Sequence, residues 1–84
     1  MSVFYITFRS VTPAQRGERL LQKSGHGCSL QRTPRWMEEE GCGYCLRLWG
    51  DDIGTCISLL RGSQVPFRKV YRQDQDGKFE EVAL

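Results

Sequence analysis

Apolar and polar residues alternate along several short stretches of this 84-residue chain. In the first stretch Phe4, Ile6 and Phe8 fall on one side, and the residues between them fall on the other. A period of two residues is typical of a β-strand with one buried face. The same pattern, together with the turn signal at Asp76-Gly77, predicts further strands. The five expected strands cover residues 3–8, 28–33, 44–49, 65–72 and 78–82.

Two other stretches follow the longer period of a helix. The first is expected to begin with Thr12 as N-cap and Pro13 in the first turn, and to end near Ser24, just before Gly25. Its face of small residues contains Ala14, Gly17, Leu21 and Ser24. The second helix is expected after a cap at Asp51 or Asp52 and to stop at Gly62. Its apolar stripe contains Ile53, Cys56, Ile57 and Leu60.

The resulting order, β-α-β-β-α-β followed by a hairpin, predicts a ferredoxin-like α+β fold, in which two helices cover one face of an antiparallel sheet. A chain of this length builds one small core, so residues 1–84 are expected to form a single domain. In this topology the loop before the third strand lies at the edge of the sheet where the first helix begins. We therefore expect Cys42 to lie near Arg9, Ser10 and Thr12.

Charge and apolar content narrow the classes of function. The formal net charge is +2, which is too small to indicate nucleic-acid binding by itself. The first residues lack the pattern of a signal peptide, and no stretch approaches the ~20 apolar residues of a membrane span. We therefore expect a cytoplasmic protein with no membrane partner. In that compartment the four cysteines indicate thiols, metal ligands or catalytic groups rather than structural disulfides.

The stretch GCGYC, residues 41–45, is the main candidate for chemistry. Gly41 and Gly43 flank Cys42 and leave its sulfur sterically open. A helix N-terminus lowers the pKa of a nearby thiol, and Arg35 and Arg9 would lower it further. The acidic run at residues 38–40 opposes this effect.

Cys42 and Cys45 also have the spacing of a thiol redox pair or of half a zinc site. A thioredoxin-type pair opens a helix, however, whereas this pair opens a strand, so its two thiols would point to opposite faces. Intrachain zinc needs about four ligands, but His26 and Cys28 are expected at the far edge and Cys56 in the core. We expect no metal within one chain, and a site shared between subunits stays open.

The chain resembles the selenium/sulfur carrier-like proteins, a family of small bacterial and archaeal proteins. The resemblance covers almost the whole chain and rests on FYITF in the first strand, SVTPA at the helix start, TPR at residues 33–35, and the Cys42-Gly43 pair followed by YCLRL. Two departures are the acidic run before the pair and a cysteine at position 45, where relatives have an aliphatic residue. The resemblance supports the ferredoxin-like fold.

The resemblance implies a function as well. Cys42 would hold a persulfide or selenopersulfide and pass it on, with Gly41, Gly43, Arg35, Thr12 and Arg9 as supporting residues and Cys45 as a candidate resolving thiol. The protein would be a carrier rather than a turnover enzyme, and the sulfur or selenium it carries covalently would be its only cofactor. The implied partners are a cysteine desulfurase or selenium donor and an acceptor protein; a homodimer is compatible with the sequence.

Two further hypotheses come from single features. Trp36, which follows Pro34-Arg35, is either a residue that docks a partner or one that packs on the sheet edge. RNA-recognition domains share the expected topology, and GCGYCLRL weakly resembles the signature of their third strand. Glu40 and Cys42 stand where that signature needs a basic and an aromatic residue, so single-stranded RNA binding is the weaker alternative. A regulatory or assembly module remains a third class.

Overall fold

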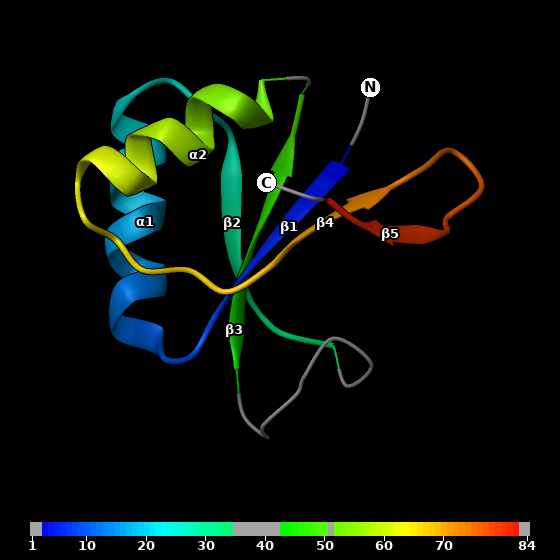
Figure 1. Ribbon diagram of the computed structural model, residues 1–84, viewed down its shortest axis with the longest axis horizontal. Helices are drawn as coiled ribbons and strands as arrows, with labels where there is room; N and C mark the ends of the chain where they lie inside the picture. The colour runs from blue at the N-terminus through cyan, green and yellow to red at the C-terminus, as the bar shows by residue number, and fades with distance from the viewer. Residues whose placement is uncertain (1–2, 35–42, 51, 83–84) are drawn as a thin grey trace.

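Two helices pack on one face of a five-stranded antiparallel sheet (Figure 1). The computed structural model describes residues 3–34, 43–50 and 52–82. The strands are β1 (Val3–Phe8), β2 (Cys28–Arg32), β3 (Tyr44–Trp49), β4 (Val70–Gln73) and β5 (Phe79–Glu81). The helices are α1 (Val11–Lys23) and α2 (Ile53–Gly62). Within the described ranges, neither helix has the length and apolar character needed to cross a membrane.

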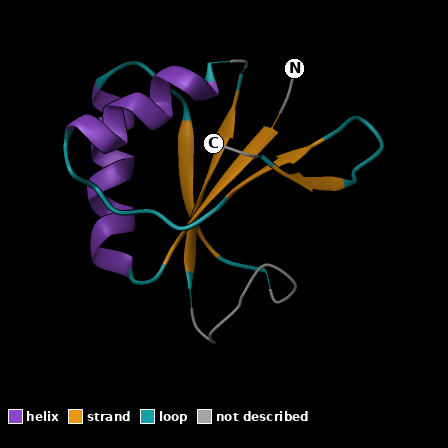
Figure 2. Cartoon of the chain, viewed as in Figure 1, coloured by secondary structure: helices purple, strands orange, loops and turns teal. Residues whose placement is uncertain are grey.

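The strands lie in the order β2-β3-β1-β4-β5, with β1 at the centre (Figure 2). β1 pairs with β3 so that Phe8 faces Tyr44 at one end and Val3 faces Trp49 at the other. The predicted α+β class is confirmed, and the elements follow one another along the chain in the predicted order. Because β5 extends the sheet beyond β4, the sheet order differs from that of a four-stranded ferredoxin-like sheet.

The core lies between the sheet and the two helices. The alternation predicted for β1 is confirmed, because Phe4, Ile6 and Phe8 are all buried on the side that faces the helices. Other buried apolar residues complete this core: Ala14, Leu21, Cys28, Leu46, Leu48, Cys56, Ile57, Leu60, Val65 and Val70. Burial of this apolar surface is the main force that holds the helices on the sheet.

The ends of the first helix differ in part from the prediction. Its N-cap is Ser10, in an extended conformation, and not Thr12, which lies exposed inside the first turn. This placement still keeps Pro13 in the first turn, where a missing N–H breaks no helical hydrogen bond. Ser24 is an exposed C-cap rather than a member of the buried face. Gly25, the glycine predicted to end the helix, follows this cap with a φ of +88°.

The fourth strand begins at Val70 and not at residue 65 as predicted. Pro66 has no N–H to offer a sheet, and residues 65–69 form an irregular segment instead. This segment is nevertheless tied to the end of β1, because Arg68 N donates to Thr7 O at 2.8 Å and Thr7 N donates to Lys69 O at 2.8 Å. The start of β4 therefore lies beside the last residues of β1.

Candidate functional site

Gly43, which follows Cys42 directly, is the described part of the Cys-Gly pair. It is buried at the start of β3, and its carbonyl oxygen accepts a hydrogen bond from Thr33 N at 3.1 Å. A Cβ at this position would lie 3.2 Å from Thr33 Oγ1 and 3.3 Å from the carbonyl oxygen of Phe8. A side chain at position 43 would therefore press on two neighbouring segments, which favours glycine there.

The backbone at Gly43 bears on a Cys42–Cys45 disulfide. A positive φ at this glycine could have curled the chain and relieved the strain of that disulfide. Among the described glycines only Gly25, Gly50 and Gly77 have a positive φ. Tyr44 begins a regular strand as predicted, so the segment after the pair is extended and a Cys42–Cys45 disulfide gains nothing from the backbone at Gly43.

Thr33 lies against this glycine and is itself buried, with 7% of its surface exposed. Its hydroxyl oxygen has no hydrogen-bond partner of normal geometry among the described residues. The hydroxyl also lies close enough to Cys45 to lower the pKa of that thiol. An unpaired buried hydroxyl is uncommon in a folded protein, and this one lies directly beside Gly43.

Cys45 lies on the face of the sheet that the helices do not cover, because the neighbouring Leu46 points into the helix-facing core. Its side chain is fully buried, and its Sγ donates a long hydrogen bond of 4.0 Å to the carbonyl oxygen of Arg32. Burial raises the pKa of the Cys45 thiol to about 11 despite the smaller lowering by Thr33. At neutral pH this thiol is protonated and shielded, so in this conformation it is a poor nucleophile.

The residues expected near the Cys-Gly pair occupy the same end of the sheet as Gly43. Phe8, whose carbonyl oxygen faces Gly43, is followed directly by Arg9 and Ser10 at the start of α1. Arg9, Ser10 and Thr12 line a groove of about 780 Å³. The other lining residues of this basic groove are Pro13, Arg16, Pro66, Phe67, Arg68 and Lys69. Arg35, Trp36, Gly41 and Cys42, together with the acidic run at 38–40, lie outside the described residues.

Part of this region does not follow from local sequence patterns. Arg16, Arg68 and Lys69 were not predicted as neighbours of Arg9, although the antiparallel pairing of β4 with β1 could have placed Arg68 and Lys69 beside the end of β1. Thr33 is predicted as the last residue of a strand, and no pattern in the sequence indicates that its hydroxyl is buried without a partner. That fact depends on the approach of Gly43 to β2.

Cys28, Cys56 and His26 gather at the opposite end of the sheet. Cys28 faces Leu48 in the register of β2 and β3, at the end of β3 farthest from Gly43. Burial raises the pKa of the Cys28 thiol to about 11, with further contributions from Glu18 and Cys56. Burial and, to a smaller extent, Asp52 raise the pKa of Cys56, which is 3% exposed as its place on the apolar stripe predicts.

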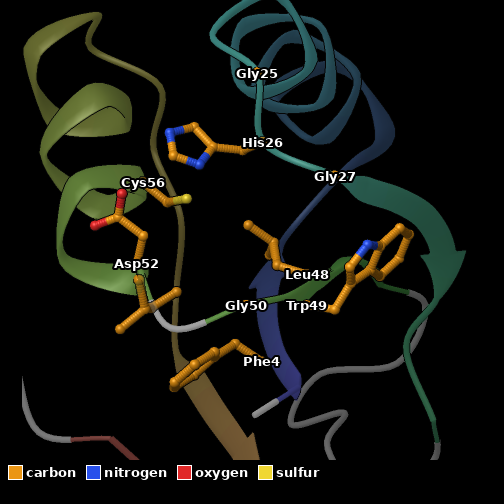
Figure 3. A pocket seen from close by; sticks show the side chains of 10 residues that line it. Phe4, Gly25, His26, Gly27, Leu48, Trp49, Gly50, Asp52 and Cys56 are labelled. Atoms are coloured by element: carbon orange, nitrogen blue, oxygen red, sulfur yellow. The ribbon is translucent and has the colours of Figure 1, made fainter. Parts of the chain in front are cut away.

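This end contains a pocket of about 160 Å³, which we call the far pocket (Figure 3). Its lining residues are Phe4, Gly25, His26, Gly27, Leu48, Trp49, Gly50, Asp52, Ile53 and Cys56. Trp49 lies across the pocket from Cys56, and a Cβ on Gly27 would collide with the Trp49 indole nitrogen at 2.8 Å. The described residues contain no group of three or more side chains arranged to hold a metal ion.

Comparison with protein families finds one match. A family model described as "Putative Se/S carrier protein-like" matches residues 4–72. The matched range includes the Cys42-Gly43 pair and runs from β1 into β4. Comparisons with curated proteins and with solved structures each find no significant match.

Proposed function

The chain belongs to the Se/S carrier-like family, and from this premise we propose that Cys42 carries sulfur or selenium as a persulfide or selenopersulfide and transfers it to a partner protein. The implied partners are a cysteine desulfurase or selenium donor on one side and an acceptor protein on the other. A reducing compartment such as the cytoplasm would keep the thiols of this carrier free.

One observation carries the assignment to Cys42 in particular. Each of the other cysteines, Cys28, Cys45 and Cys56, is buried and has a raised thiol pKa. Persulfide transfer needs a thiolate that a second protein can reach, and a buried, protonated thiol meets neither condition. The proposal therefore places the cargo on the one cysteine that the motif itself singles out.

The burial of Cys45 also favours a carrier over a two-cysteine redox module. A resolving thiol must attack the sulfur of its neighbour, which requires both access and a populated thiolate. Cys45 has 0% exposed surface and a pKa raised to about 11. It could resolve a loaded Cys42 only after the start of β3 separates from Thr33 and Phe8.

Loading on Cys42 is an exchange reaction that needs no outside oxidant. The Cys42 thiolate attacks the outer sulfur or selenium of a donor persulfide or selenopersulfide. The bond between that atom and the donor sulfur breaks, a new bond to the Cys42 sulfur forms, and the donor leaves as a thiolate. Delivery to an acceptor thiolate repeats the same exchange with Cys42 as the leaving group.

Intact-mass measurement after incubation with a cysteine desulfurase and free cysteine tests the proposal. The wild-type protein should gain the mass of one sulfur atom, and a reductant should remove it. Cys42→Ser should abolish the gain, whereas Cys28→Ala and Cys56→Ala, matched controls in the buried set, should keep it. Loading that persists in Cys42→Ser, or that disappears only in Cys45→Ala, would overturn the assignment.

A further inference from the structure

The basic groove at the start of α1 combines positive charge with an open shape. Among the described residues that line it, four of nine are cationic, namely Arg9, Arg16, Arg68 and Lys69, and none of these nine is acidic. The protein as a whole has a net charge of only +2. The described lining of this groove therefore carries more positive charge than the protein has overall.

We propose that the basic groove binds an acidic peptide segment of the protein that gives chalcogen to this carrier or takes it away. The inference rests on the proposed function and deepens it by naming the chemistry of the partner. The expected segment carries several carboxylates with an apolar side chain among them.

The cations of the groove remain available to a ligand to different degrees. Arg9 and Arg16 are exposed, and no ion pair joins either of them to a described residue. Lys69 has a contact with Glu81 at 3.6 Å, in which both side chains are substantially exposed. Such an exposed pair is weak, so an incoming carboxylate can compete for the Lys69 ammonium group.

The helix α1, which borders the groove, adds to the positive electrostatic potential of the groove. The first turn of α1 contains no acidic residue, and the Ser10 side chain makes no capping hydrogen bond. The backbone N–H groups at the start of the helix therefore keep their partial positive charge toward this side. A carboxylate bound there would take the place of the missing cap.

The apolar part of the groove favours a peptide over a bare anion. Pro13, Pro66 and Phe67 share the lining with the cations, and the Phe67 ring is only half-buried, with the Arg61 guanidinium 5.8 Å from its centroid. Inorganic phosphate would leave this apolar surface in water. A peptide that places an apolar side chain on Phe67 between its carboxylates would use both kinds of surface.

The groove also lies where a transfer partner has to dock. Thr7, beside the end of β1, binds Lys69 through the backbone, and the next residue, Phe8, faces Tyr44 at the start of β3. The start of α1, which borders the groove, and the start of β3 lie at the same end of the sheet (Figure 1). A partner segment held here would place its protein beside the residue that follows Cys42.

Binding of a fluorescein-labelled peptide of glutamates interrupted by phenylalanine tests the inference directly. Fluorescence anisotropy should show saturable binding to the wild-type protein, which weakens as salt is raised. The double variant Arg9→Glu, Arg16→Glu should weaken binding at least ~10-fold. The double variant Arg19→Glu, Lys23→Glu changes the net charge equally on exposed positions farther along α1, and it should bind as wild type does.

Several results would overturn the inference. These are equal weakening by the two double variants, equal binding of the peptide with glutamine in place of glutamate, or stronger binding of inorganic phosphate or single-stranded RNA than of the acidic peptide. The desulfurase loading assay separates the two proposals. Loading on Cys42 without peptide binding rejects the groove alone, and peptide binding without loading on Cys42 rejects the carrier role alone.

Discussion

The two ends of the sheet differ in charge and in the size of the hollow beside them. Where β3 begins, Gly43 packs tightly against Phe8 and Thr33, and the neighbouring basic groove of about 780 Å³ is open. Where β3 finishes, Cys56 borders a far pocket of about 160 Å³, and Cys28 is buried close by. One strand thus runs from the end with the basic groove to the end where Cys28 and Cys56 are buried.

The difference shows why cysteine content alone says little about function. Four cysteines in 84 residues invite a search for a metal site or a redox pair. The topology separates the described cysteines instead. Cys28 and Cys56 lie at the end of the sheet with the far pocket, and Cys45 lies on the face that the helices do not cover. Free cysteine behaves as a small apolar residue at such positions. What distinguishes the other end is charge and backbone fit rather than thiol number.

The largest expected effect concerns pH, and it would test whether the buried thiols at the two ends are equivalent. Cys28 and Cys45 each have a pKa raised from the usual 9.0 to about 11. Between these two values the unfolded chain has lost protons that the folded protein keeps, so the free energy of unfolding falls as pH rises. The slope is at most about 1.4 kcal/mol per pH unit for each thiol.

Urea unfolding under reducing conditions between pH 8 and 10.5 would measure this slope. Cys28→Ala and Cys45→Ala should each flatten the decline relative to wild type, whatever they do to stability at pH 8. A variant that keeps the full slope would show that its thiol titrates normally in the folded protein, and the two ends would then differ in thiol burial as well as in charge.

The second prediction concerns the close approach at Gly43. Gly43→Ala should lower the free energy of unfolding by about 1–3 kcal/mol, because its new Cβ would press on the Phe8 carbonyl oxygen and on Thr33. Gly54→Ala is the matched control, since nothing lies within 4 Å of its Cβ position and it sits inside α2. This control should stabilise the protein by about 0.5–1 kcal/mol.

Chemical denaturation of the two variants tests whether Gly43 is needed for packing or for the function of Cys42. If Gly43→Ala is as stable as wild type, the start of β3 has room to adjust and the glycine serves Cys42 rather than packing. In that case the intact-mass assay should still show impaired loading of Gly43→Ala.

Much of the architecture could be predicted because it follows from short-range patterns. Alternation placed Phe4, Ile6 and Phe8 in the core, and the i, i+3, i+4 spacing placed Cys56 and Ile57 there as well. The order of the elements was then enough to bring the start of the first helix to the end of the sheet where β3 begins. These inferences need only periodicity and chain connectivity.

The features that were mispredicted or missed depend on contacts between distant segments. The close packing of Gly43 against Phe8 and Thr33 is one such feature, and the local Gly-rich sequence does not reveal it. The basic groove exists because the segment at Pro66 leaves the strand and is still held against Thr7. A pattern along one segment cannot report such pairings.

The last prediction, and the most specific, concerns two buried threonines on either side of the start of β3, Thr7 in β1 and Thr33 just after β2. Thr7 Oγ1 donates to Lys69 O at 3.3 Å and accepts from Lys69 N at 3.0 Å, whereas Thr33 Oγ1 has no partner among the described residues.

Valine has nearly the same shape as threonine but lacks the hydroxyl. Thr33→Val should therefore stabilise the protein by about 1 kcal/mol, because it removes an unpaired buried polar group. Thr7→Val should destabilise it by about 1–3 kcal/mol, because it removes the hydroxyl acceptor of the Lys69 N–H and the second donor to the Lys69 carbonyl oxygen. Paired urea titrations would measure both. If Thr33→Val loses stability as Thr7→Val does, the Thr33 hydroxyl is bonded in solution, and intact-mass analysis of the loaded protein would show whether that bond supports the cargo on Cys42.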